Sequence, residues 1–436
     1  MTKEELKKEI LAKIDEKSDE IIEIGQDIFA HPELGYKEHR TSALVKKVFE
    51  NMGLSPRTGL AITGVSARID FAKSGPNVCI MGELDAVVCP GHRYADPITG
   101  AAHACGHNGQ IASMLGVAMG IVNSGARDHL GGAVTFLGVP AEEYVELEYR
   151  QKLVDEGRIS FFGGKQQLLR EGFFDGVDMA MMTHMGSLSG PVKVTVGGTS
   201  NGFVGKLVKY TGREAHAGAS PETGINALNA AMIGLMSIHA QRETFRDQDH
   251  IRVHPIITKG GDLVNVIPAD VRMETYVRGK TMNAIRDASL KVNRAIQAGA
   301  YALGAQVEIK EIPGYLPRKN CPEFDRVFWN NAVALLGRTA VEEGQHGAGS
   351  SDIGDLMHLM PAIHPSCGGA KGAGHSQDFM IADPVEAYIV PAKLMAMTLV
   401  DLLWNDASKA REIIKGFVPE MTKEEYFAMW DEILSR

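Results

Sequence analysis

Two short stretches of the sequence carry side chains that could bind a metal ion and activate water. The first is His103-Ala104-Cys105-Gly106-His107, in which a thiol and an imidazole are two residues apart. If this stretch is extended, alternate side chains point the same way, and Cys105 and His107 can reach one ion. A thiolate with imidazole favours zinc, whereas carboxylates with imidazole also allow manganese or cobalt. A buried free cysteine beside loop histidines is an equally good interpretation of this stretch alone. For His103 we expect either a structural role or a role in supporting a metal ligand.

The second stretch, Pro140-Ala141-Glu142-Glu143, sets two carboxylates side by side. Adjacent side chains of an extended chain project in opposite directions, so we expect the two glutamates to have different roles. We predict that Glu143 binds a metal ion and that Glu142 takes a proton from water, whose pKa a metal lowers to about 7. A solvated acidic pair is the commoner meaning of two adjacent glutamates. The position of this pair, directly after an apolar run, weakens that alternative.

Three isolated residues could complete such a site. His184 follows an apolar stretch, where a histidine is more often a core residue than a ligand. His375 lies in a glycine-flanked loop and is the better ligand candidate, although a lone loop histidine is usually only exposed. Asp85 could orient a ligand histidine through its carboxylate, or it could cap a neighbouring element.

The elements that must position these residues indicate an α/β fold. Buried strands are predicted at 78–82, 132–139 and 177–183, because each is a short, continuous apolar run. Asp85, the glutamate pair and His184 each follow one of these strands. Because open α/β sheets carry their chemistry at the carboxyl ends of strands, we predict a shared rim. The charged segment 144–162 is predicted to be an insertion near it. A further strand is expected at 65–71, and helices are expected at 2–30, 41–52, 111–122, 165–171, 324–336 and 385–404.

The pattern changes after residue 186, where glycine and serine indicate a linker. From 205 to 312 the predicted order is strand, helix, strand, strand, helix, strand, which is typical of a ferredoxin-like unit. We therefore predict a catalytic domain in two parts, 1–190 and 314–436, around an inserted domain, 191–313. A free edge of the inserted sheet favours a homodimer. On residue type alone, three polar residues of the inserted domain are interpreted as ordinary: His216, Asn265 and Arg278.

Composition limits the classes of partner. The chain has 436 residues, more than one ordinary core holds, and this length favours two domains. The net charge of −9 is spread along the chain and gives no reason to expect nucleic acid or an anionic membrane as a partner. Five scattered cysteines argue for a reducing compartment. Because no stretch reads as a signal core or a membrane span, we expect a cytoplasmic protein.

Taken together, the motifs resemble those of a known family, the aminoacylase/carboxypeptidase metallopeptidases of peptidase family M20, subfamily D. The resemblance is strongest to the aminobenzoyl-glutamate hydrolase and dipeptidase-like branch, and the motifs come in family order over nearly the whole chain. They are His31-Pro32-Glu33-Leu34-Gly35, Gly82-Glu83-Leu84-Asp85-Ala86, His103-Ala104-Cys105-Gly106-His107-Asn108, Pro140-Ala141-Glu142-Glu143, Ala215-His216-Ala217, Asn265-Val266-Ile267-Pro268, Gly349-Ser350-Ser351-Asp352 and His375-Ser376.

The resemblance implies a zinc-peptidase-like catalytic domain with a mixed sheet flanked by helices, an inserted dimerisation domain and two divalent metal ions per subunit. Zinc is the expected metal, with manganese or cobalt as alternatives. By matching positions, Glu142 is implied as the general base and Arg278 as the residue that binds a substrate carboxylate. His216 and Asn265 are implied to reach the site of the partner subunit and to hold the oxyanion. The implied metal ligands are Cys105, His107, Glu143, His184 and His375.

The sequence departs from the family pattern in two motifs and one segment. Gly82-Glu83 stands where many members have Arg-Ala-Asp, and Asn108 replaces a common aspartate. The segment 144–162 is longer than usual, which bears on substrate choice more than on mechanism.

These observations predict a homodimeric amidohydrolase that cleaves the amide bond of an N-acyl or N-aroyl amino acid, such as aminobenzoyl-glutamate, or of a small dipeptide. Two alternatives remain. One is deamination of an aromatic amine at the same site, and the other is a non-catalytic protein that keeps the fold to bind a small molecule. The complete ligand set together with Glu142 argues against the second.

Overall fold

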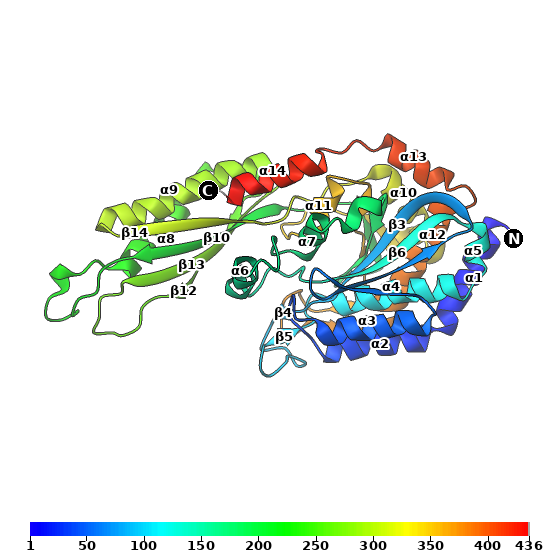
Figure 1. The fold of residues 1–436 in the computed structure, drawn as a ribbon, viewed down its shortest axis with the longest axis horizontal. Coiled ribbons are helices and arrows are strands. Elements are labelled where there is room, and N and C mark those ends of the chain that lie inside the picture. The colour runs from blue at the N-terminus through cyan, green and yellow to red at the C-terminus, as the bar shows by residue number, and fades with distance from the viewer. Residues whose placement is uncertain (435–436) are drawn as a thin grey trace. The chain divides into compact units, whose positions relative to one another are not determined.

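The computed structural model describes residues 1–434, which form two compact units (Figure 1). The first unit comprises Met1–Gly198, Lys319–Gln345 and Asp355–Glu420. The second comprises Thr199–Arg318, His346–Gly354 and the described residues from 421 onward. Two segments belong to a different unit from the one that the predicted domain limits of 190 and 313 assign them to. Strand β9 (Val194–Val196) pairs within a sheet of the first unit, and helix α14 (Lys423–Leu434) packs against the second.

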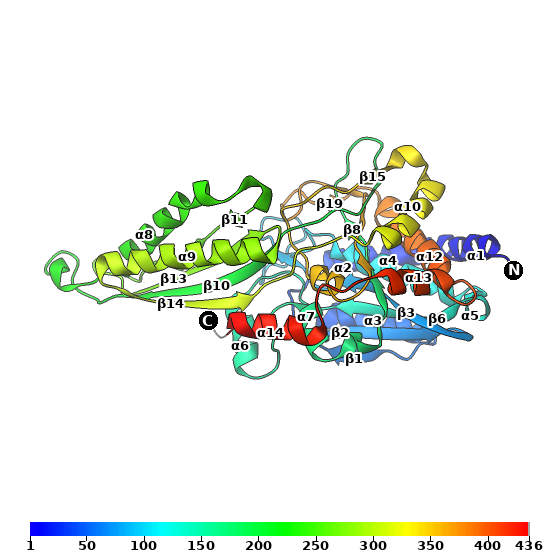
Figure 2. The same ribbon diagram turned by 90° about the horizontal axis from the view of Figure 1, so that it is seen from above.

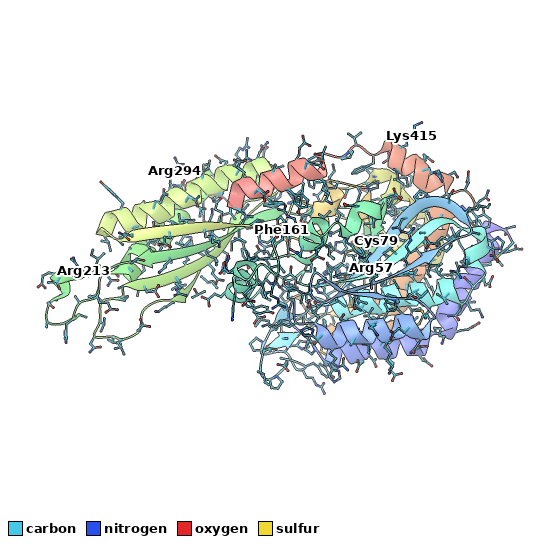
Figure 3. All side chains as sticks on the ribbon, in the orientation of Figure 1. Arg57, Cys79, Phe161, Arg213, Arg294 and Lys415 are labelled. Atoms are coloured by element: carbon cyan, nitrogen blue, oxygen red, sulfur yellow. The ribbon has the colours of Figure 1, made fainter. Side chains whose placement is uncertain are left out.

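A mixed six-stranded sheet forms the centre of the first unit. Its order is β1 (Arg57–Leu60), β2 (Gly64–Asp70), β6 (Gly131–Val139), β3 (Lys73–Glu83), β7 (Met179–Met181) and β16 (Ala362–Ile363). β3 runs parallel to both β6 and β7, whereas β2 is antiparallel to β6. β6 is buried along its whole length, as expected for a strand covered on both faces. Packed side chains such as Cys79 of β3 fill the space around the sheet (Figure 3).

Helices flank this sheet, which confirms the predicted α/β architecture. α4 (His107–Val122) packs on β3 and is covered in turn by α2 (Ser18–Ala30) and α12 (Val390–Leu403). Because α4 is apolar all round, it is buried on every side. The other helices outside the second unit's core are α1 (Lys3–Glu16), α3 (His39–Asn51), α5 (Ala126–His129), α6 (Leu147–Asp155), α7 (Gly164–Arg170), α10 (Pro322–Leu336), α11 (Ile353–Met357) and α13 (Ser408–Gly416).

Two helix predictions need correction. The helix expected over 2–30 is two helices, because Lys17 leaves the helical conformation with φ −100° and ψ 6°. The helix expected over 385–404 opens with a π-helical turn, Val385–Ile389, before α12 begins.

Short strands hold the loops of the first unit. A four-stranded sheet has the order β15 (Val341–Glu343), β9, β17 (Ser366–Cys367) and β8 (His184–Met185). Two further pairs are β4 (Val87–Val88) with β5 (Ala101–Ala102), and β18 (Ala370–Lys371) with β19 (Met380–Ile381). No helix within residues 1–434 is long and apolar enough to cross a membrane.

The second unit is an antiparallel sheet with two helices on one face (Figure 2). The strand order is β11 (Arg252–Val253), β13 (Asp270–Gly279), β10 (Gly202–Thr211) and β14 (Gln306–Pro313), with β12 (Ile256–Lys259) also on β13. The helices are α8 (Ala227–Ala240) and α9 (Met282–Leu303). This arrangement confirms the ferredoxin-like prediction. The second strand of the predicted order is divided into β11 and β12, and Pro255, which has no N–H to donate, lies between them.

Candidate metal centre

The candidate site lies at one edge of the six-stranded sheet. β6, β3 and β7 are neighbouring parallel strands, so their carboxyl ends meet at the same edge. Glu142 and Glu143 follow β6. Asp85 follows β3, and His184 begins β8 shortly after β7. The shared rim predicted from the three apolar runs is therefore present.

The side chains proposed as ligands form two groups that share one thiol. The possible ligand atoms of Cys105, His107 and His184 lie within 4.8 Å of one another, and so do those of Cys105, Glu143 and His375. The Cys105 sulfur is 3.5 Å from His184 Nε2 and 3.3 Å from His375 Nε2. His375 Nε2 is 3.1 Å from Glu143 Oε1. The fold thus brings together all five predicted ligands, from positions 105 to 375 of the chain.

A left-handed glycine positions Cys105 and His107. Gly106 has φ +83° and caps the N-terminus of α4, so the stretch turns here and is not extended as predicted. A Cβ at this position would come within 2.9 Å of Met185 Cβ, which only glycine avoids. His107 occupies the first turn of α4, and its Nδ1 donates to the backbone oxygen of Asp85 at 2.9 Å. Its Nε2 is therefore the nitrogen left to bind a cation.

The loop that carries the glutamate pair is fixed by buried polar groups. Ala141 has φ +55°, and its N–H donates to Glu38 Oε1 at 2.7 Å. The Glu143 N–H donates to Asp85 Oδ2 at 2.8 Å. Arg150, in the segment 144–162, is fully buried and donates to the backbone oxygen of Glu143. That segment thus contacts the loop of the glutamate pair, and Asp85 accepts hydrogen bonds from both Glu143 and His107.

A third group of possible ligand atoms comes from Glu83, His107 and Glu142, which again lie within 4.8 Å of one another. Glu142 Oε2 is 3.8 Å from His107 Nε2, so this carboxylate faces the centre. The two adjacent glutamates therefore join different groups, as their predicted difference in role requires. Sequence reasoning did not assign a role to Glu83. The available signal was its position at the end of a buried strand.

Mutual charge within the centre shifts the pKa values of its groups. Burial and Glu143 act to raise the pKa of the Cys105 thiol, but His107 and His184 outweigh them and lower it to about 6. Hydrogen bonds to Cys105 and Glu143 raise the pKa of His375 to about 11. Burial opposes the charged form of His184, but the Cys105 thiolate raises its pKa overall. These pKa shifts favour the protonated form of His184 and His375, at positions where a cation can replace the proton.

The donor set fits divalent metal ions. His107 Nε2 and Glu143 Oε1 are buried and make no hydrogen bond of ordinary geometry, although each has an oppositely charged neighbour 3.1 Å away. Buried polar atoms normally have a partner, so these two atoms are well placed to be ligands of a cation. Imidazole, thiolate and carboxylate together suit zinc best and also allow manganese or cobalt.

His103 is buried and is close to Cys105 in the sequence, but it belongs to none of the three groups of possible ligand atoms. Neither of its ring nitrogens has a hydrogen-bond partner among the described residues, and burial lowers its pKa to about 3. It is a neutral core residue, in keeping with the structural role expected for it.

The second unit holds the three remaining predicted site residues. His216 and Asn265 are both exposed and lie on neighbouring segments. An isolated β-bridge pairs His216 with Val266, and the Ala217 N–H donates to the backbone oxygen of Asn265 at 2.9 Å. His216 Nδ1 accepts from the N–H groups of Gly218 and Ala219. The other ring nitrogen, Nε2, is then the donor.

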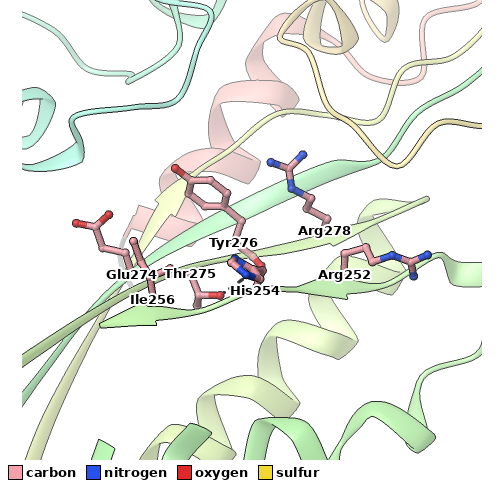
Figure 4. Close-up of a pocket in the computed structure, with 7 residues that line it drawn as sticks. All are labelled: Arg252, His254, Ile256, Glu274, Thr275, Tyr276 and Arg278. Carbon is pink, nitrogen blue, oxygen red and sulfur yellow. Dashed lines mark hydrogen bonds between the residues drawn. The ribbon is translucent and has the colours of Figure 1, made fainter. Parts of the chain in front are cut away.

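Arg278 lines a pocket of about 390 Å³ on the sheet of the second unit (Figure 4). Its guanidinium lies over the rings of Phe203 and Tyr276 and donates to Ser350 Oγ at 3.1 Å. The pocket is also lined by Arg252 from β11, by Tyr276 and by the carboxylate of Glu274, so it combines two arginines with one aromatic ring and one acidic side chain. Such a pocket suits an anionic group.

Comparison with known proteins relates both units to peptidases. The peptidase dimerisation domain family matches residues 199–302. Xaa-Arg dipeptidase of Mus musculus is 27% identical over 429 residues, covering 92% of this chain and 90% of that protein. N-acyl-L-amino acid amidohydrolase of Geobacillus stearothermophilus is 27% identical over 359 residues, covering 80% and 90%. The crystal structure of Bacillus subtilis YXEP, a dinuclear metal binding peptidase, shares the fold with a TM-score of 0.66 at 22% identity, covering 89% of this chain and 99% of that one.

Proposed function

Because this chain belongs to the M20 peptidase family and is a hydrolase of peptide or amide C–N bonds, we propose that it cleaves a small N-acylated amino acid with the help of two divalent metal ions. The proposed substrates are N-acyl and N-aroyl amino acids, of the aminobenzoyl-glutamate kind, and small dipeptides. The observation that carries this proposal is the convergence of five ligand-type side chains on Cys105, with Glu142 facing the same centre.

The two groups of side chains divide the work of holding the metals. Cys105, His107 and His184 would hold one ion. Glu143 and His375 would hold the other, with the Cys105 thiolate available to both. When bound, the ions supply Lewis-acid stabilisation of the carbonyl oxygen and lower the pKa of the attacking water.

Glu142 has the position of the general base. It is nearly buried, and its Oε2 lies 3.8 Å from His107 Nε2, at the edge of the proposed metal centre. It takes a proton from the attacking water as the water oxygen bonds to the carbonyl carbon. It then returns that proton to the amide nitrogen as the C–N bond breaks, which yields a carboxylic acid and an amine. The acid then gives its remaining proton to the amine or to solvent.

The second unit supplies groups for the substrate. Arg278 would bind the carboxylate of the amino acid through charge-assisted hydrogen bonds. His216 and Asn265 would stabilise the oxyanion in the site of the partner subunit of a homodimer. The dimer is proposed to form through this unit, and two exposed methionines on one side of α8, Met232 and Met236, support it. The free state of all five cysteines supports a cytoplasmic location.

The test is a substrate screen on metal-depleted protein that is reloaded with zinc, manganese or cobalt, one at a time. The panel contains N-acyl amino acids, N-aroyl amino acids and dipeptides, and products are quantified by mass spectrometry. We expect equal amounts of amine and carboxylic acid, formed only after reloading. Ammonia released from an aromatic amine would indicate a deaminase instead. Absence of bound metal together with absence of turnover would indicate a binding protein.

A further inference from the structure

The carboxylate of Glu83 is held rigidly at the end of β3. Its side chain is 1% exposed, and its Oε1 accepts from Lys165 Nζ at 2.6 Å. Its Oε2 accepts from Gln110 Nε2 on α4 at 2.7 Å. The Glu83 N–H also donates to the side-chain oxygen of Gln110, so two hydrogen bonds join Glu83 and Gln110. Lys165 is itself fully buried near the start of α7.

The same carboxylate faces the metal centre. Glu83 Oε2 lies 3.1 Å from His107 Nε2, the nitrogen that is left for a cation once Nδ1 has bonded to Asp85. An ionised carboxylate can accept about four hydrogen bonds or ligand contacts in all. Lys165 and Gln110 account for one contact on each oxygen, and the Oε2 lone pair toward His107 remains available.

We propose that Glu83 is a further metal ligand, and that its Oε2 binds the cation held by His107 Nε2 while Lys165 and Gln110 fix the carboxylate in place. This inference rests on the proposed function, because it requires a cation at His107. It adds one anionic ligand beyond the five predicted from the sequence.

A simpler assignment would make Glu83 only the counter-ion of Lys165. Two observations favour a ligand. A counter-ion needs contact with the ammonium group alone, whereas Glu83 also presents its second oxygen to His107 and shares a group of possible ligand atoms with His107 and Glu142. In addition, ligand carboxylates in metal sites are themselves hydrogen-bonded by neighbouring groups, as Glu83 is by Gln110.

The experiment measures metal binding and does not depend on turnover. Wild-type protein and Glu83→Gln are stripped of metal and titrated with Zn²⁺, and bound metal is counted by mass spectrometry after gel filtration. The Co²⁺-loaded forms are compared by visible absorption, which reports the ligands around the ion. We expect Glu83→Gln to bind one of two ions at least about 10-fold more weakly and to show a changed Co²⁺ spectrum.

Two further variants keep the result interpretable. Glu83→Gln removes the charged partner of Lys165 at 2.6 Å, so the double variant Glu83→Gln/Lys165→Met removes both charges of this buried pair and limits damage to the fold. We expect it to show the same loss of metal. The control Glu386→Gln removes an ion pair with Lys193 elsewhere in the first unit and should bind metal normally.

The outcomes separate the two proposals. Wild-type affinity and an unchanged Co²⁺ spectrum in the double variant would overturn the role of Glu83 and leave it as the counter-ion of Lys165. Wild-type protein that binds no metal at all would overturn the proposed function itself.

Discussion

Arg150 is predicted to hold the loop of the glutamate pair in place, and its replacement by alanine tests that role. Its guanidinium is fully buried and donates to the backbone oxygens of Phe162, at 2.7 Å, and of Glu143. A third, longer contact of 3.4 Å reaches the Ala141 oxygen. These three acceptors are backbone oxygens, so the side chain joins α6 to the chain on both sides of Glu142.

The cost of Arg150→Ala follows from these bonds. A hydrogen bond from a charged donor contributes about 1.5–3 kcal/mol, so the loss of the two short bonds lowers the free energy of unfolding by about 3–6 kcal/mol. At about 2–4 °C per kcal/mol for a domain of this size, Tm falls by at least about 6 °C. Release of the Glu143 oxygen also loosens this ligand, so metal affinity falls as well.

The assay is urea unfolding of the metal-free protein followed by circular dichroism, with Zn²⁺ titration of the folded form. Arg150→Lys keeps the charge but not the planar fork, so it should lose part of the stability. Lys152→Ala, on the exposed side of the same helix, is the matched control and should unfold like wild type. If Arg150→Ala has wild-type stability and metal affinity, Arg150 does not support the loop and the reasoning fails.

Three further predictions concern pH and assembly. Burial and then the charge of Asp85 raise the pKa of Glu38 to about 8. Between about pH 4.5 and 8 the folded protein therefore keeps a proton on Glu38 that the unfolded chain has lost. The free energy of unfolding should decline as pH rises through this range. Glu38→Gln should flatten this slope in thermal unfolding of the metal-free protein from pH 5 to 9, and an unchanged slope would reject the assignment. Because the pKa of His375 is raised to about 11, Zn²⁺ binding at pH 7 should release protons, and the affinity should increase as pH rises. Calorimetry in buffers of different ionisation enthalpy measures the number of protons released. A value of zero would contradict this prediction. If His216 serves the partner subunit's site, heterodimers of His216→Ala and Glu142→Ala should recover activity that both parent dimers lack, whereas inactive, verified heterodimers would contradict sharing.

The arrangement of strands was predictable because burial leaves a direct mark on the sequence. Strands covered on both faces must be apolar throughout, and β3, β6 and β7 are marked by such runs. The second unit was predictable because its strands and helices differ in hydrophobic period. The placement of Asp85, Glu143 and His184 near one another then followed from the rule that parallel strands end at one edge.

The local geometry of the site was not predictable, because it depends on contacts between distant residues. The chain turns into α4 at Gly106, and this position must be glycine because Met185 leaves no room for a side chain. The carboxylate of Glu83 is held by a hydrogen bond from Lys165, which lies 82 residues later in the chain. No local sequence pattern indicates that partner. Arg150 likewise binds backbone oxygens that carry no sequence signal.

Asn108 illustrates a departure from the family pattern that the structure explains. Its side-chain N–H₂ donates to the backbone oxygen of Gly25 at 3.0 Å and to the hydroxyl of Tyr388 at 2.9 Å. A carboxylate at this position could donate to neither oxygen. The two N–H donors of asparagine are therefore matched to their acceptors, whereas its side-chain oxygen is buried without a hydrogen-bond partner among residues 1–434.

The measurement that tests the central claim most directly is the turnover and metal content of Glu142→Gln, determined on the same preparation. The substitution keeps the size of the side chain and removes its ability to take a proton, while Cys105, His107 and Glu143 stay intact. We predict wild-type metal content and a loss of kcat of about 100-fold or more. A variant that still hydrolyses the amide at the wild-type rate would contradict the assignment of Glu142 as the base and, with it, the mechanism proposed for this site.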